Sequence, residues 1–312
     1  RGSDEITGGS GPDRIRGDEF WSLVLKGAEL PEAWTGGNGA TGPGENDTGP
    51  GENENNSKGD NSNRIINRVD FGGIPAQIAK LMSTGENILL LAADVARRRN
   101  QLLGRLPVKN CGVEQVLLAS SRCGSPIIKK RVDELDRSTP TLMLADFHTA
   151  STTAGLAGSF DHVVFVDPPL NRKVLNSIAL AAPESHIHLF HCSNEVKFTK
   201  EVLEHEFDLR GPVTKVYRHL QAGKEYFFDE ATERLLLAGG KYLRQPAMVA
   251  RCIKVLEELS LVSVEEREEK PILTLLEPAK TDLDKSPTYK QARLFYKECL
   301  RYLKKSPGAK MD

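Results

Sequence analysis

The distribution of apolar residues divides the chain into three parts. Residues 35–63 are dominated by Gly, Asn, Glu, Asp, Ser and Thr and hold almost no apolar side chain. Such a segment cannot bury enough surface to offset the entropy lost on ordering, so we expect a disordered linker. A short apolar island that includes Trp34 precedes it, and we interpret residues 1–34 as the remnant of a preceding domain.

Short apolar runs follow the linker, each about five residues long and without polar alternation. Continuous runs of this kind are typical of strands covered on both faces, as in a parallel sheet. Helix-length segments separate them, which favours right-handed strand–helix–strand crossovers. The pattern predicts an α/β domain over residues 64–206, helicase-like or Rossmann-like, with a parallel sheet of about five strands. The runs are Ile88–Ala92, Gln115–Ala119, Thr141–Ala145, His162–Val166 and Ile187–Phe190.

The pattern changes after this domain. Three segments have helical periodicity, and two apolar runs around a charged turn follow them within residues 261–276. Three helices followed by two strands are typical of a winged-helix-like unit. Ser286 marks the start of a last helix as its N-cap. We therefore expect a second, mostly helical domain over residues 207–312. Its first three helical segments are 208–221, 229–239 and 246–259.

Composition narrows the classes of function. The five cysteines show no spacing typical of zinc ligands or disulfides, so we interpret them as small buried side chains in a reducing compartment. No apolar run approaches the roughly 18 residues of a membrane helix, and no cleavable leader is visible. We expect a cytoplasmic protein with no membrane partner. The opening at Arg1 fits a fragment of a longer protein.

Charge is distributed unevenly. Residues 1–63 carry 5 Lys/Arg against 12 Asp/Glu, whereas the remaining residues carry 37 against 31. A mildly basic body beside an acidic segment is a weak indication of nucleic-acid binding. The alternative is that the acidic segment simply keeps the chain soluble.

The α/β domain carries no motif that binds the phosphates of a nucleotide. Neither a GxxxxGK[ST] loop nor a GxGxxG turn is present. Asp167 ends a strand in the manner of a magnesium-binding position of ATPases. Without a phosphate loop we interpret Asp167 as the cap of a turn with Pro168 and Pro169. We predict no bound cofactor and no ATP hydrolysis.

A group of histidines suggests a metal site at first sight. His186 and His188 face one way on a strand, while His191 has the opposite parity. Cys192 follows directly as a further candidate ligand, but tetrahedral zinc would need a bend at Phe190 and a fourth ligand from elsewhere. The apolar residues between the histidines favour an edge strand with partly exposed imidazoles instead, so we predict no metal ligand.

Two groups of cations are candidates for nucleic-acid binding, and in both a merely solvated helix face is the alternative. The first group follows the first strand, close to the sheet edge where α/β domains bind ligands. It comprises Arg97, Arg98 and Arg99. The second group forms one stripe on the last helix, beside an apolar face that should dock on the rest of the domain. The stripe comprises Lys290, Arg293, Lys297, Arg301 and Lys304. The apolar face comprises Tyr289, Ala292, Tyr296, Cys299, Leu300 and Leu303.

Several segments carry a resemblance to one known family. They are Asp94–Arg98, His162–Pro169, Asp208–Arg210, Tyr217–Arg218, Arg251–Leu259, Lys280–Leu283 and Ser286–Tyr289. Their order resembles the C-terminal region of the bacterial single-stranded-DNA-specific exonuclease RecJ, in its longer actinobacterial-type variants. The resemblance covers about residues 64–303, and its motifs are structural rather than catalytic.

The resemblance implies an accessory region of a 5′-to-3′ exonuclease that acts in DNA recombination and repair. That family hydrolyses phosphodiesters with Mn²⁺ or Mg²⁺ in an Asp-His-His domain. The nearest local match here, Asp161–Val163, lacks the second histidine, so no catalytic residue carries over. We predict an inactive chain whose partners are single-stranded DNA, the catalytic core of the same exonuclease, and single-stranded-DNA-binding protein. The alternatives are a winged-helix DNA-binding regulator with an α/β sensing domain, and a structural scaffold.

Overall fold

The computed structural model describes most of the chain after the glycine- and asparagine-rich segment. The described residues are 30–31, 34, 65–66, 73–106, 112–122, 125–221, 225–227, 244–265, 272–277 and 280–305. The expected linker at 35–63 and the predicted helix at 229–239 lie outside them, as does most of the segment 1–34.

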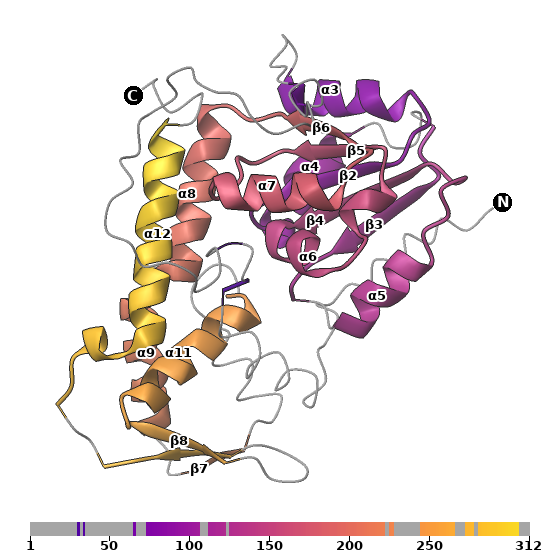
Figure 1. Ribbon diagram of the computed structural model, residues 1–312. Helices are drawn as coiled ribbons and strands as arrows, with labels where there is room; N and C mark the ends of the chain where they lie inside the picture. Colours follow the sequence, from indigo (N-terminus) through magenta and orange to yellow (C-terminus); the bar gives the residue numbers. More distant parts are fainter. Residues whose placement is uncertain are drawn as a thin grey trace.

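A parallel sheet forms the centre of the first unit (Figure 1). Its strand order is β1-β6-β5-β2-β4-β3, and all the pairings are parallel. The strands are β1 (Ile65–Ile66), β2 (Ile88–Ala92), β3 (Gln115–Ala119), β4 (Thr141–Asp146), β5 (His162–Phe165) and β6 (His186–Leu189). The predicted α/β fold with a parallel sheet is confirmed. The two-residue strand β1 had no signal in the apolar pattern.

Helices cover both faces of the sheet, which explains why its central strands are buried and mostly apolar, with polar residues only at their ends. β2, β4 and β5 are buried over their full length. Residues that alternate along them pack into two separate cores, one under α3 and α4 and the other under α6, α7 and α8. The helices are α3 (Gly73–Met82), α4 (Val95–Leu102), α5 (Ser125–Asp133), α6 (Phe147–Thr152), α7 (Arg172–Ala181) and α8 (Ser193–Phe207).

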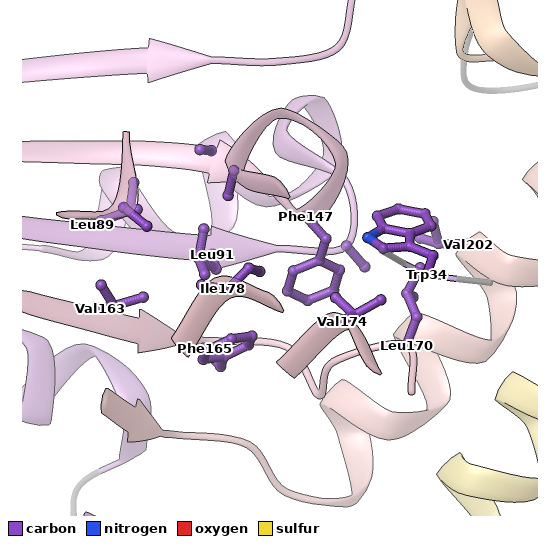
Figure 2. Packing of buried hydrophobic residues seen from close by; sticks show 14 of the residues in the cluster. Trp34, Leu89, Leu91, Phe147, Val163, Phe165, Leu170, Val174, Ile178 and Val202 are labelled. Carbon is purple, nitrogen blue, oxygen red and sulfur yellow. The ribbon is translucent and has the colours of Figure 1, made fainter. Parts of the chain in front are cut away.

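The core beneath α6 and α7 also includes Leu30 and Trp34, which precede the glycine-rich segment in the chain. Figure 2 shows Trp34 beside Leu170 and Val202, at the end of the row of buried strand residues. Its indole Nε1 donates a hydrogen bond to Ser151 Oγ at 3.1 Å, and its ring stacks on Phe295 at 5.7 Å. Trp34 is 3% exposed, so this residue belongs to the core of the α/β unit.

Trp34→Phe should lower the free energy of unfolding by about 1–2 kcal/mol, because it removes one hydrogen bond and part of the ring contact while a smaller ring still fills most of the space. Chemical denaturation with an unchanged m-value would measure this loss. Ser151→Ala is the control for the hydrogen bond alone. An unchanged midpoint in Trp34→Phe would mean that the hydrogen bond and ring contact of Trp34 contribute no stability.

The described residues of the second unit form helices α9 and α11 and a small antiparallel sheet of order β7-β9-β8. Together they bury a separate apolar cluster. The elements are α9 (Arg210–Gln221), β7 (Glu225–Phe227), α11 (Pro246–Glu258), β8 (Val262–Glu265) and β9 (Ile272–Leu275). The expected mostly helical C-terminal region is confirmed, and the structure adds β7, which the apolar pattern did not indicate.

The last helix, α12 (Pro287–Lys305), connects the two units. Phe295, Cys299 and Leu303 pack into the core of the α/β unit, where α12 lies alongside α8 (Figure 1). Ala292 packs into the cluster of the second unit. Ser286 caps α12, as predicted, by accepting a hydrogen bond from the amide of Tyr289 at 3.0 Å. Among the helices of the described ranges, none combines the length and apolar character needed to cross a membrane.

Candidate nucleic-acid interface

The exposed side of α12 presents a row of cations. We define the cationic row as Lys290, Lys297, Arg301 and Lys304, which are all exposed and have no ion-pair partner within the described part of the chain. The helix holds a single acidic residue, Glu298, which lies 3.9 Å from Lys173 of α7. Leu294 lies between Lys290 and Lys297 on the same side and is 65% exposed. The row is therefore a positive surface with one apolar side chain in its middle.

Arg293 is separated from the row by its contacts. It lies 2.8 Å from Asp284 in η5 (Leu283–Lys285), and its guanidinium stands over the ring of Tyr289. Its charge is thus largely balanced. The stripe expected from the sequence contains Arg293, whereas the structure leaves the four other members without a described partner.

The buried face of α12 differs in part from the predicted one. Ala292, Cys299 and Leu303 are buried as expected, while Tyr289, Tyr296 and Leu300 are only half-buried. Phe295, which the prediction omitted, is 3% exposed and contacts the ring of Phe207 at 4.9 Å. The spacing of 292, 295, 299 and 303 is the helical signal that identifies this face.

The three consecutive arginines of α4 have different environments. Arg97 forms an ion pair with Asp94, the N-cap of α4, at 3.3 Å. Arg98 is 9% exposed, and its guanidinium binds the carboxylate of Asp167, with Nε 3.0 and 3.2 Å from the two oxygens. Arg99 remains half-exposed. Since Arg98 is buried and engaged, we do not include it in the proposed DNA surface.

Asp167 binds the α4 helix rather than capping a proline turn. Besides Arg98, its carboxylate accepts a hydrogen bond from the backbone amide of Ala93 at 2.9 Å. Complete burial raises the pKa of Asp167 to about 6, and the charge of Arg98 acts in the opposite direction. The interpretation of Asp167 as a turn cap is therefore wrong: its role is to hold Arg98 at the end of β5.

The carboxylates at the carboxyl edge of the sheet serve as helix caps and arginine partners. Asp94 caps α4 and accepts two hydrogen bonds from Arg122. Asp146 caps α6 and also accepts from Ser120 and Ser121, which follow β3. Within the ranges that the structure describes, no three His, Cys, Asp or Glu side chains lie together as metal ligands. Asp94 and Asp146 thus cap the amino ends of α4 and α6 at this edge of the sheet.

The histidines of β5 and β6 form a hydrogen-bonded chain near the amino edge of the sheet. Glu86 contacts His162 at 2.7 Å, and His162 contacts His188 at 3.0 Å. The hydrogen bond with His162 lowers the pKa of Glu86. His186 is exposed, but His188 is buried because β6 lies between β5 and β1. The expectation of an edge strand with partly exposed imidazoles is therefore wrong for His188.

Hydrogen bonds between polar residues join the two units at the end of α8. Glu206 is 1% exposed and accepts a hydrogen bond from the amide of Gln245 at 3.1 Å. Arg244 donates to the carbonyl of His205, and Arg251 donates to that of Glu206. Burial, followed by the charge of Arg244, lowers the pKa of His205 to about 4. His205 is therefore neutral in the folded protein at neutral pH.

His205 should make the protein less stable in mild acid. Its folded pKa lies below the unfolded value of 6.5, so the unfolded chain takes up a proton first as the pH falls from 6.5 to about 4. His205→Gln should remove about 1 kcal/mol of this acid-induced loss, after allowance for partial solvent exposure. Thermal melting of both proteins across this pH range measures the difference. Because Glu206 has a raised pKa and acts in the opposite direction, only the comparison between the two proteins is diagnostic. Parallel profiles would contradict the prediction.

No family model matches the chain, and no curated protein matches it either. Among solved structures, the C-terminal part of the Fun30 ATPase domain is similar over 41% of this chain and 43% of that chain. The sequence identity is 15% and the TM-score is 0.31. The match thus spans less than half of that chain, and such a low TM-score identifies neither a shared fold nor a function.

Proposed function

We propose that this chain is an accessory region of a RecJ-like 5′-to-3′ single-stranded-DNA exonuclease and that it holds single-stranded DNA. The observation that carries the proposal is the cationic row of α12. Phosphates bind to closely spaced lysines and arginines because counterions are released from the strand. Leu294, exposed beside these cations, adds an apolar contact for a base whose face is open, as in a single strand.

The sequence resemblance to the C-terminal region of RecJ is a second, separate support for the proposal. It includes the segment Asp282–Tyr289, which leads into α12, and Arg251–Leu259 of α11. On this proposal the catalytic Asp-His-His domain, with its Mn²⁺ or Mg²⁺, belongs to another part of the exonuclease. The protein works in the cytoplasm with that catalytic core and with single-stranded-DNA-binding protein.

The surface of α11 argues against a regulator that reads duplex DNA. α11 stands where a winged-helix unit would place its recognition helix. Arg251 of α11 is 4% exposed, and its guanidinium lies over the ring of Phe207. Lys254 binds Glu257 at 2.9 Å. Arg251 is therefore not available to a DNA groove, and the charge of the exposed Lys254 is balanced by Glu257, so α11 is poorly suited to read duplex DNA.

Fluorescence anisotropy with labelled oligonucleotides tests the proposal. A single strand should bind more tightly than a duplex of the same sequence, and four neutralised phosphates predict a slope of about −3 for the logarithm of the binding constant against that of the salt concentration. With Mn²⁺ present, the oligonucleotide should remain intact. Sequence-selective binding of the duplex would instead support a winged-helix DNA-binding regulator. No binding at low salt would support a structural scaffold.

A further inference from the structure

A cavity of about 400 Å³ opens at the carboxyl edge of the sheet, beyond the ends of β5 and β6 and beside α3 and α4. This edge is where open α/β sheets bind ligands. The volume lies within the range of roughly 300–1,000 Å³ that is usual for small-molecule sites. No residue of the cationic row lines the cavity, so it is distinct from the surface proposed to hold a DNA strand.

Part of the cavity wall is apolar. Ile74 and Pro75 come from the first turn of α3, Leu102 ends α4, and Val166 and Phe190 follow β5 and β6. Val166 and Phe190 are buried, so the sheet fixes their positions. Such a wall suits a flat, uncharged ring system, because burying the ring removes apolar surface from water.

Other residues of the wall supply hydrogen bonds without net charge. Gln77 and Gln101 line the cavity, and the amide oxygen of Gln101 is held by Arg98 at 2.9 Å. A side-chain amide both donates and accepts hydrogen bonds, which is how amides recognise the edge of a base. His191 also lines the cavity, and its buried Nδ1 has no hydrogen-bond partner. Burial lowers the pKa of His191, so a neutral ring can offer one more hydrogen bond.

The positive charge that remains is at one place. Arg98 is balanced by Asp167 and by Glu195, a carboxylate that also lines the cavity and lies 3.9 Å from Arg98. Arg105, at the end of η2 (Leu103–Arg105), is exposed and has no ion-pair partner among the described residues. The first turn of α3 lines the same cavity, and the amino end of a helix carries partial positive charge. One free cation and one helix end suit a single phosphate group.

We propose that this cavity binds one nucleotide unit, with the base against the apolar wall and the amides and the phosphate at Arg105 and the amino end of α3. A triphosphate does not fit the proposal, because the sequence contains no phosphate loop. A free nucleoside monophosphate and the terminal nucleotide of a DNA strand present the same chemistry. Nucleotide binding here does not require the cationic row.

Isothermal titration calorimetry with the full chain tests the site, using deoxyadenosine 5′-monophosphate as the probe and inorganic phosphate as the comparison. The nucleotide should bind more tightly than phosphate. Arg105→Ala should weaken nucleotide binding about tenfold, since one charge-assisted hydrogen bond is lost. Arg99→Ala is the matched control, because Arg99 lies on the adjoining helix and does not line the cavity. Ile74→Trp, which fills the space, should abolish binding in a protein that melts normally.

A second titration, with a 5′-phosphorylated oligonucleotide and the variant Lys297→Glu/Arg301→Glu, identifies the source of the nucleotide. Stronger binding of the oligonucleotide, lost in Arg105→Ala, assigns the site to a strand end. Equal or weaker binding than that of the monophosphate assigns it to the free nucleotide. The inference is overturned if neither probe binds, if phosphate binds as tightly as the nucleotide, or if Arg105→Ala has no effect. Because this variant lacks half of the cationic row, failure here is distinguishable from failure of the proposed DNA surface.

Discussion

A chain carrying Lys297→Glu and Arg301→Glu is expected to bind single-stranded DNA about tenfold to a hundredfold more weakly than the wild type at low salt. Both side chains are exposed on α12 and have no described partner, so their replacement leaves the folded structure intact. The salt dependence should fall as well, by about 1.4 in slope if each side chain neutralises one phosphate.

The matched control reverses two exposed lysines elsewhere on the surface. Lys129→Glu with Lys130→Glu on α5 changes the net charge by the same amount, and α5 lies on the opposite side of the α/β unit from α12 (Figure 1). This variant should lose little affinity, because only the general field of the protein changes. Equal losses in the two variants would show that binding follows net charge rather than the cationic row.

The position of α12 gives the row its fixed geometry. Phe295 and Leu303 anchor the helix in the α/β core, and Ala292 anchors it in the second unit. Glu258 of α11 also accepts hydrogen bonds from Ser286 and Thr288 at the start of α12. A helix held at both units cannot rotate freely, so its opposite side stays exposed. The same residues thus join the two units and orient the proposed DNA surface.

The apolar pattern was sufficient to predict every strand of the sheet except β1, because a strand covered on both faces has no polar alternation. Runs such as Ile88–Ala92 therefore stand out as continuous apolar segments, and they form β2 to β6 within one or two residues of the predicted bounds. Helical spacing likewise predicted the last helix, and a serine directly before Pro287 predicted its cap at Ser286. These signals are local, and each can be recognised within a few turns of chain.

The parts that the sequence did not predict depend on partners far apart in the chain. Asp167 meets Arg98 across 69 residues, and Trp34 meets Ser151 across 117. The periodicity of a sequence does not show which charged or aromatic side chains come into contact after folding. The candidate cavity could not be predicted for the same reason, because its wall combines the start of α3, the end of α4 and the ends of two strands.

The second large effect concerns the buried pair Arg98 and Asp167. Asp167→Asn keeps the shape and the hydrogen bond from Ala93 but leaves Glu195, at 3.9 Å, as the one counter-charge of the buried Arg98 guanidinium among the described residues. An uncompensated buried charge should lower the free energy of unfolding by about 3 kcal/mol. Asp133→Asn, at an exposed position of α5, should change it by less than about 0.5 kcal/mol.

Removing both charges should restore much of the stability, because a buried pair contributes little beyond the hydrophobic residues that could replace it. The double variant Arg98→Met/Asp167→Asn is thus expected to be more stable than Asp167→Asn alone, in urea denaturation at neutral pH.

Arg98→Met alone leaves the buried carboxylate of Asp167, whose folded pKa is already raised to about 6. A raised carboxyl pKa contributes stability at low pH that is lost as the pH rises. Because the charge of Arg98 opposes the effect of burial, removing it raises this pKa further, so Arg98→Met should gain stability relative to the double variant as the pH falls from neutral. If the double variant instead loses the sum of the two single losses, the side chains act independently and Asp167 is not the counter-charge that holds Arg98 at the sheet edge.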